Sequence, residues 1–172
     1  MALIVEDGSA MPDAESWCSV AHADQYHSSL GNDEWGALSI SVKEQTLRKG
    51  TNYLMQEYGM KWAGYRTTST QALDWPRTQV PIPDLQYVAY IPDNVIPIDI
   101  QNACASLGLR STTEDLTENE TRQVVREKVD VIEIQYSENS TTQKQYTEID
   151  NMLGKYLKGG SSTGGALPMV RV

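Results

Sequence analysis

Proline is distributed unevenly along this chain, and its distribution sets the first limit on the fold. Five of the seven prolines lie between Trp75 and Pro97. Each proline fixes a backbone torsion and lacks the N–H group that a helix or sheet needs, so this density excludes a long helix or a central strand. The segment is therefore expected to be an extended loop on the surface. A short strand over residues 85–91, between the breakers, is the alternative.

Two amphipathic helices are predicted before this segment. The first begins after Ser19, a favourable cap, and stops at Gly31. The second has serine and glutamate at capping-box spacing, with Ser41 as the cap and Glu44 three residues on, and it ends at Gly59. The faces expected to be buried are Val20, Ala23, His27 and Leu30 in the first helix, and Leu47, Thr51, Leu54 and Tyr58 in the second.

Gly50 lies inside the second predicted helix. Glycine in a helix interior costs about 1 kcal/mol relative to alanine. Its presence there indicates that something gains from the missing side chain, and we expect another backbone to approach closely at this point.

The chain after the proline-rich segment is predicted to hold a helix, a hairpin and a last helix. Pro97 suits the first turn of the helix, where a missing N–H does no harm. The β-branched residues in 124–136 predict a hairpin that turns near Asp130. Thr147 can cap the last helix, and Gly159 can stop it. The expected buried faces are Ile100, Ala103, Cys104 and Leu107, and then Ile149, Met152, Leu153, Tyr156 and Leu157.

These elements predict a mainly α fold with an appended tail. Residues 1–158 form a small helical bundle with a β-hairpin near 124–136 and a long proline-rich loop. Residues 159–172 form an extended C-terminal arm, whose glycine- and serine-rich start behaves as a flexible coil. The apolar end of this arm has no evident place in the core, so it is expected to become ordered on another component of an assembly. That end consists of Leu167, Pro168, Met169, Val170, Arg171 and Val172.

Charge and hydropathy exclude several kinds of partner. The 172 residues carry a formal charge of −9. Nucleic-acid binding takes most of its affinity from cations that neutralise phosphates, and the cations here are scattered, so direct DNA binding is disfavoured. No stretch nears the roughly 18 apolar residues of a membrane span, and no basic signal region is present, so a soluble protein that is made in the cytoplasm and has no membrane partner is expected. Cys18 and Cys104 form no CxxC motif, as in a reducing compartment.

The candidates for catalysis or metal binding are weak. His22 and His27 are five residues apart and lie on different sides of a helix, so they cannot form the i, i+4 pair of a metal site. With Asp24 between them, a weak metal or acid–base site stays as an alternative. No GxSxG, GxGxxG or P-loop motif occurs. We predict no catalytic residue, no cofactor and no metal, and a solvated face for the acidic residues Asp13, Glu15, Asp33, Glu34, Glu114, Asp115, Glu118 and Glu120.

The aromatic residues are distinctive in kind. The chain has four tryptophans and nine tyrosines but no phenylalanine. Tryptophan and tyrosine combine a large apolar surface with a polar tip, and both are enriched at protein interfaces. The sequence leaves core and interface equally open for Trp17, Trp35, Trp62 and Trp75.

Two stretches in the first half of the chain follow a recognisable pattern. Residues 5–8, residues 14–26 and Trp35 are similar to V-x-DG … A-x-SY-x-SV-x-x-A-x-x-Y … W, the opening of a family of tailed-bacteriophage neck proteins. Residues 71–77 read QALDWPR, which is close to the family's QAL-x-WPR signature. This tryptophan–proline–arginine motif is the most specific single element of the resemblance.

The second half extends the resemblance over nearly the whole chain. Residues 127–136 and 149–157 are similar to the family's late hairpin and terminal helix. Three departures concern details: Trp17 stands where tyrosine is usual, Cys18 is idiosyncratic, and the polar stretch 137–145 is longer than expected.

The resemblance implies a structural role in the neck of a phage particle. Such proteins are head-to-tail connectors, or adaptors, which form a twelve-fold ring below the portal of the DNA-filled head. The ring extends the DNA channel and receives the stopper or tail. The implied partners are further copies of the chain, the portal protein, and stopper or tail proteins. Genomic DNA passes through the lumen without sequence-specific binding.

Two sets of residues are the predicted contacts in such a neck. The apolar end, residues 167–172, is expected to add to a sheet edge or fill a groove on the portal, with residues 159–165 as its tether. The hairpin turn is expected to contact a neighbouring subunit or the next ring. That turn is formed by Val129, Asp130, Val131 and Ile132.

Other roles remain open on the sequence. A stopper or tail-completion protein is the nearest competitor, although a stopper is expected to be richer in β structure. The family also carries the label DnaT-like single-stranded-DNA-binding protein. A replication factor is the more distant alternative, because the chain is acidic and shows no basic groove.

Overall fold

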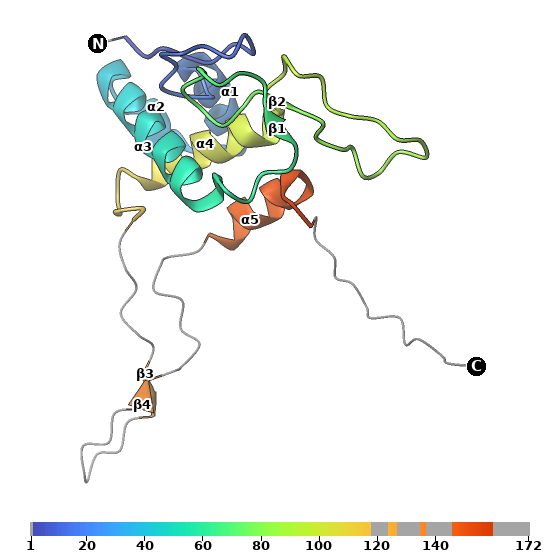
Figure 1. Ribbon diagram of the computed structural model, residues 1–172. Coiled ribbons are helices and arrows are strands. Elements are labelled where there is room, and N and C mark those ends of the chain that lie inside the picture. Colours follow the sequence, from blue (N-terminus) through green and yellow to red (C-terminus); the bar gives the residue numbers. More distant parts are fainter. Residues whose placement is uncertain (1, 118–123, 127–134, 137–145, 160–172) are drawn as a thin grey trace.

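The fold is mainly helical and carries two small antiparallel sheets (Figure 1). The computed structural model describes residues 2–117, 124–126, 135–136 and 146–159. The helices are α1 Val20–Leu30, α2 Asp33–Gly36, α3 Ile40–Tyr58, α4 Ile98–Arg110 and α5 Thr147–Leu153, which continues into the 3₁₀ turn Gly154–Tyr156. The strands are β1 Tyr65–Arg66, β2 Arg77–Thr78, β3 Val124–Arg126 and β4 Gln135–Tyr136.

The sequence predicts one of the two strand pairs and not the other. β3 pairs antiparallel with β4, which confirms the predicted hairpin, and its predicted turn at Val129–Ile132 lies outside the described residues. β1 pairs antiparallel with β2, with Tyr65 opposite Thr78. This second pair is not predictable from the sequence, because strands of two residues leave no period-2 pattern.

Gly31 and Gly59 end α1 and α3 as predicted, whereas only one of the three predicted N-terminal caps is correct. Ser19 caps α1 as expected, because its side chain accepts a hydrogen bond from the His22 amide at 3.1 Å. The predicted cap Ser41 is wrong: α3 begins earlier, and Ser39 accepts from the Val42 amide at 3.4 Å. Two serines two residues apart suit a cap equally well, and Leu38, which packs against the core just before Ser39, fixes the earlier one.

The predicted cap of α5 is also wrong. Thr147 is the first helical residue, and Tyr146 precedes it without a side-chain capping bond. Tyr146 is buried and packs edge-to-face on Tyr53 of α3, with ring centroids 5.4 Å apart. Aromatic packing, rather than a capping hydroxyl, therefore sets the start of this helix.

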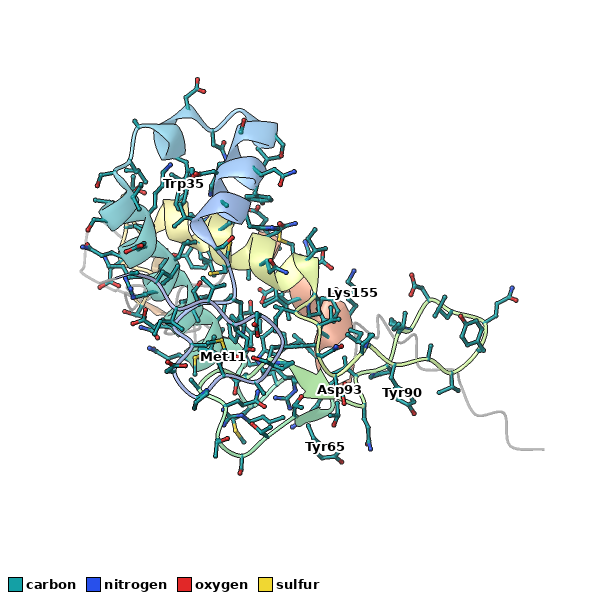
Figure 2. All side chains as sticks on the ribbon, turned by 90° about the horizontal axis from the view of Figure 1, so that it is seen from above. Met11, Trp35, Tyr65, Tyr90, Asp93 and Lys155 are labelled. Carbon is teal, nitrogen blue, oxygen red and sulfur yellow. The ribbon has the colours of Figure 1, made fainter. Side chains whose placement is uncertain are left out.

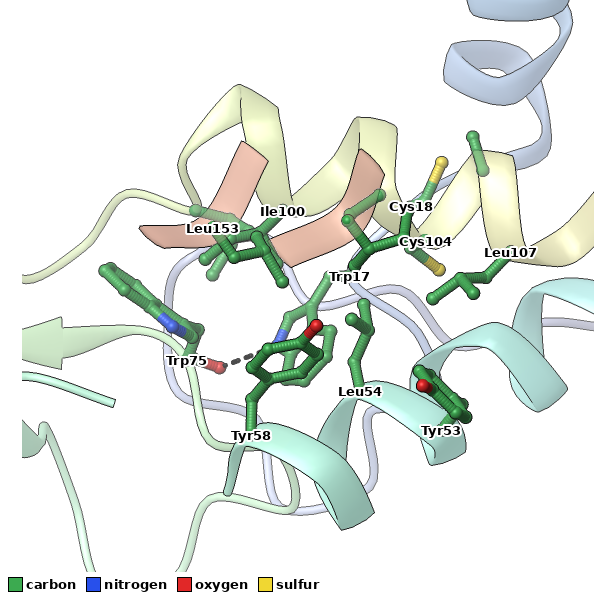
Figure 3. Packing of buried hydrophobic residues seen from close by; sticks show 14 of the residues in the cluster. Trp17, Cys18, Tyr53, Leu54, Tyr58, Trp75, Ile100, Cys104, Leu107 and Leu153 are labelled. Carbon is green, nitrogen blue, oxygen red and sulfur yellow. Dashed lines mark hydrogen bonds between the residues drawn. The ribbon is translucent and has the colours of Figure 1, made fainter. Parts of the chain in front are cut away.

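The core lies where α3, α4 and α5 meet (Figure 3). All four residues predicted for the buried face of α3 are buried, and so are all four predicted for α4. Ile149 and Leu153 bring α5 onto the same core. Leu30 is the exception in the predicted faces: it is exposed, because α1 turns away at Gly31 directly after it.

The four tryptophans all belong to this core. Trp17, Trp35, Trp62 and Trp75 are each no more than 1% exposed, so the choice between core and interface is decided for the core. Trp62 packs edge-to-face on Trp75 at 5.9 Å between ring centroids. The Trp17 indole donates to the Trp75 carbonyl at 3.3 Å, which ties the N-terminal segment to the centre of the fold (Figure 3).

The proline-rich segment forms a long loop, and the alternative strand over residues 85–91 is wrong. The loop leaves the body near β2 and extends away from the helices before it returns to α4 (Figure 1). Residues 83–88 belong to no strand and are all exposed. The C-terminal residues 160–172, including the predicted portal contact, lie outside the described residues. Within the described part of the chain, no helix is long and apolar enough to span a membrane.

Gly50 lies at the crossing of α3 and α4, as expected. A Cβ atom built on Gly50 would lie 2.8 Å from the Cys104 carbonyl oxygen and 3.2 Å from the Gly108 nitrogen. The missing side chain therefore lets the backbone of α4 approach the backbone of α3.

We predict that Gly50→Ala destabilises the protein despite the better helix propensity of alanine. The substitution gains about 1 kcal/mol in propensity, but forcing a methyl group against backbone costs about 1–3 kcal/mol. A net loss of up to about 2 kcal/mol in the free energy of unfolding is expected from urea titration. Gly154→Ala is the control, because nothing lies within 4 Å of its added Cβ. Equal or greater stability of Gly50→Ala would contradict the close contact.

Candidate protein-interaction loop

The tip of the proline-rich segment carries several exposed apolar and aromatic side chains close together in sequence. We call residues 81–91 the proline loop. Its two limbs pair at the base, where Ile82 donates to the Ala89 carbonyl and Ile91 donates to the Val80 carbonyl, both at 2.9 Å. These bonds hold the tip away from the body, and Figure 2 shows the loop extending beyond Tyr90.

Four apolar or aromatic side chains of the proline loop are exposed. Leu85 is 41% exposed, Tyr87 69%, Val88 83% and Tyr90 55%. Scattered apolar residues on a surface need no explanation, but a contiguous apolar group on a projecting segment is typical of a protein-binding site. Tyrosine contributes a large contact area at low entropic cost, as it does at many interfaces.

The charge of this segment indicates what it can bind. Residues 79–97 contain no lysine or arginine, and their charged residues are Asp84 and Asp93. Single-stranded nucleic acid is bound by aromatic side chains that stack on bases together with cations that neutralise phosphates. The proline loop has the aromatic side chains but not the cations. Its chemistry therefore suits a protein surface better than a phosphate backbone.

The tryptophan–proline–arginine motif holds the chain just before the proline loop. The Arg77 guanidinium is buried and donates to three backbone carbonyls: Ala63 at 2.8 Å, Gly64 at 2.9 Å and Asp74 at 3.1 Å. Gln71 is also buried, and its amide donates to the Leu73 carbonyl at 2.8 Å. Side chains thus satisfy carbonyls that no regular element could pair.

Asp74 is the acidic residue of this motif, and it lies near two arginines. Burial raises the pKa of the Asp74 carboxyl, and the nearby Arg66 and Arg77 oppose that rise. Arg77 of the motif and the neighbouring Arg66 both donate to backbone carbonyls, so the motif is architectural.

The N-terminal motif holds the chain just after the proline loop. The buried Glu6 carboxylate accepts from three backbone amides: Gly8 at 3.0 Å, Ala10 at 2.9 Å and Met11 at 2.8 Å. A Cβ atom on Gly8 would lie only 2.0 Å from the Asn94 carbonyl oxygen, and its φ is +102°. Only glycine fits there. Two motifs far apart in sequence therefore fix the two ends of the proline-rich segment.

Most of the cations whose side chains the structure describes are engaged with protein groups; Lys49, which lines a surface hollow, is not among them. Lys43 pairs with Asp24 at 2.8 Å, and Lys155 pairs with Asp99 at 2.7 Å. Three more ion pairs are Arg48 with Glu15, Lys61 with Glu57 and Arg110 with Glu148. Arg66, Arg77 and Lys158 donate to backbone carbonyls. A phosphate would have to displace these partners one by one.

The residues weighed for metal or acid–base chemistry have structural partners. His27 is buried, with Nε2 at 3.0 Å from the Ala105 carbonyl and Nδ1 at 3.0 Å from the Asn32 amide nitrogen. Burial lowers the pKa of His27. Asp24 accepts from Trp35 at 2.7 Å as well as from Lys43. In the ranges that the structure describes, no three His, Cys, Asp or Glu side chains gather as metal ligands would.

The two cysteines are free and buried. Cys104 lies 3.2 Å from the Thr51 hydroxyl and 3.6 Å from the Ser16 hydroxyl, within the core. This small polar cluster joins the N-terminal segment, α3 and α4. Its hydroxyls bond one another and nearby carbonyls, as expected of polar groups inside a core.

Two of the hollows on the described surface lie beside α3 and at the root of the proline loop. One of about 560 Å³ is lined by Lys49, Asn52, Tyr53 and Gln56 of α3 and by residues 111–117. The other, of about 660 Å³, lies at the root of the proline loop. We call it the root hollow; it is lined by Ala63, Pro81, Pro83, Asp150, Asn151, Gly154, Lys155, Leu157, Lys158 and Gly159.

The predicted contact residues, Leu167–Val172 and Val129–Ile132, lie outside the described residues, so the structure brings none of them to a site. The proline loop was predicted as a surface loop, but its side chains were not recognised as a candidate site. One signal was available in the sequence: Leu85, Tyr87, Val88 and Tyr90 occur in a segment that proline excludes from regular core structure.

Comparison with known proteins places the chain in a family. A family model described as "Putative DnaT-like ssDNA binding protein" matches residues 1–172. The chain belongs to this family. A search of the curated proteins and a search of the solved structures each found no match. The family description mentions single-stranded DNA, so the engagement of most of the described cations with protein groups bears directly on function.

We predict that Arg77→Lys strongly destabilises the fold. Lysine cannot reproduce the planar fork that reaches three carbonyls, and each hydrogen bond to a charged group contributes about 1.5–3 kcal/mol. A loss of about 3 kcal/mol or more in the free energy of unfolding is expected from urea titration. Arg110→Lys is the control, since its pair with Glu148 is partly exposed and such pairs contribute at most about 1 kcal/mol. If both variants lose the same stability, Arg77 does not have this structural role.

Proposed function

We propose that this protein is a structural head-to-tail connector, or adaptor, of a tailed bacteriophage. In this role it forms a ring below the portal, extends the DNA channel and docks the stopper or tail. The proposal takes its specific form from the resemblance of residues 5–35 and 71–77 to neck proteins. The single structural observation that carries it is the proline loop, a largely apolar projection suited to protein contact on a body most of whose described cations are engaged with protein groups.

A connector needs a rigid body and surfaces that meet other proteins. A closed ring joins two unlike faces of each subunit. In this chain the family motifs are used for internal hydrogen bonds at Glu6 and Arg77, which supports a role that depends on shape. The projecting loop then provides one of the faces.

The acidic charge agrees with a channel through which DNA must slide. A subunit charge of −9 repels phosphates, so DNA is not retained on the wall. We expect the lumen of the ring to be mainly acidic. A stopper or tail-completion protein would share several of these needs, and the predominance of helix favours the adaptor among the neck components.

Single-stranded DNA binding is the second candidate function, and the family description is what favours it. Exposed tyrosines at positions 87 and 90 could stack on bases. The absence of cations from residues 79–97 is unfavourable to it, because the backbone phosphates would meet Asp84 and Asp93 instead.

Disruption of the gene in the genome that carries it separates the two candidates. For a connector we predict normal synthesis of phage DNA and filled heads without tails, as seen by electron microscopy of the lysate. A plasmid copy of the gene is the matched control and restores tailed particles. Loss of phage DNA synthesis would favour the replication factor. Infectious tailed particles made without the protein would contradict the connector.

A binding assay on the purified protein gives the same distinction at the molecular level. A connector is expected to show no saturable binding to a fluorescent oligo-dT. Binding that saturates and weakens steeply with salt would instead support the replication role.

A further inference from the structure

The root hollow and the tip of the proline loop have complementary surfaces. The hollow measures about 660 Å³ and is formed between the loop's own root, at Pro81 and Pro83, and the end of α5. Ala63 and Leu157 add to its apolar wall. A hollow of this size has room for bulky side chains such as those of the tip, and its apolar wall suits them.

The charges of the two surfaces are opposite. The tip carries Asp84 and no cation, whereas the rim of the hollow carries Lys155 and Lys158. The bond from Lys155 to Asp99 raises the pKa of Lys155, which keeps the ammonium charged. Asp150, which also lines the hollow, accepts a hydrogen bond from the Tyr58 hydroxyl at 2.6 Å. The tip thus carries one acid, whereas the hollow is lined by two lysines and one acid, so the net charges of the two surfaces are opposite in sign. Lys155 is paired with Asp99 and Lys158 donates to the Met60 carbonyl, so an incoming acid would share these ammonium groups with their present partners.

A tip cannot occupy the hollow of its own chain. The loop starts at the hollow, and the paired limbs at Ile82 and Ala89 direct the tip away from it (Figure 2). An occupant with the tip's chemistry must therefore come from another molecule. A second copy of the chain supplies such a tip and also presents a root hollow of its own, so the contact can repeat from copy to copy.

We propose that residues 84–88 of one copy dock in the root hollow of a second copy. This inference rests on the structural role proposed above and names its partner as a neighbouring subunit. The contact is heterologous, since it joins two different surfaces, and repetition closes a ring or extends a filament. The prolines stiffen the loop, which lowers the entropy that docking costs. Each contact is small, and many contacts in one ring strengthen one another.

Disulfide trapping between two purified full-length variants tests the contact. One variant carries Val88→Cys at the tip, and the other carries Asn151→Cys at the hollow, where both native residues are exposed. The native cysteines are fully buried and do not compete. Mixed under mild oxidation, this pair is expected to give at least about fivefold more mixed disulfide than Val88→Cys mixed with Gln45→Cys, which is also exposed. A fivefold preference corresponds to about 1 kcal/mol.

Charge-reversal substitutions change the yield of mixed disulfide only if the two surfaces meet specifically, and not if they collide at random. Asp84→Lys in the tip variant is expected to lower the yield of mixed disulfide, and Lys158→Glu in the hollow variant is expected to restore it. Equal yields from the hollow pair and the Gln45 control would overturn the proposal. A predominance of tip-to-tip disulfide would also overturn it, because it would show a symmetric contact between loops.

Failure of this test and failure of the connector proposal are distinguishable. The trapping experiment uses only purified protein, so a negative result removes the loop-to-hollow contact and leaves the gene-disruption result standing. If the trapping succeeds but disruption of the gene abolishes phage DNA synthesis, the loop-to-hollow contact stands and the connector proposal is rejected.

Discussion

The close crossing of α3 and α4 at Gly50 and Gly108 is the constraint on which the rest of the structure depends. The crossing places the Cys104 carbonyl where a side chain on Gly50 would otherwise stand. It brings the apolar faces of both helices together, and α5 packs beside them through Leu153. The tryptophans of the loops close over this centre. A body of this kind resists deformation, as expected of packed protein interiors.

The most specific sequence motifs of the chain serve this body and the loop it presents. Arg77 and Gln71 satisfy backbone carbonyls before the proline-rich segment, and Glu6 and Gly8 fix the backbone after it. The side chains that remain outside, such as Val88, are apolar and lie on the loop between these anchors. Family membership thus concerns architecture first, and the surfaces that meet partners lie elsewhere.

Much of the fold could be predicted because helical periodicity reports burial directly. The faces of α3 and α4 and the role of Gly50 follow from spacing alone. The predicted caps at Ser41 and Thr147 were wrong because tertiary packing selects the start of each helix. Packing against the core favours Ser39 over Ser41, and the buried aromatic residue before Thr147 sets the start of α5. The candidate site was the least predictable part. Exposure of Tyr87 depends on where the whole loop points, and only tertiary structure determines that.

The central claim is that this chain builds an assembly through protein contacts. Electron cryo-microscopy of tailed particles that carry the gene product tests it most directly, because the neck layers are seen in place. The account predicts a ring of this chain below the portal, with each proline loop in contact with a neighbouring protein. A neck that lacks the chain, or a ring whose proline loops meet only solvent, would contradict it.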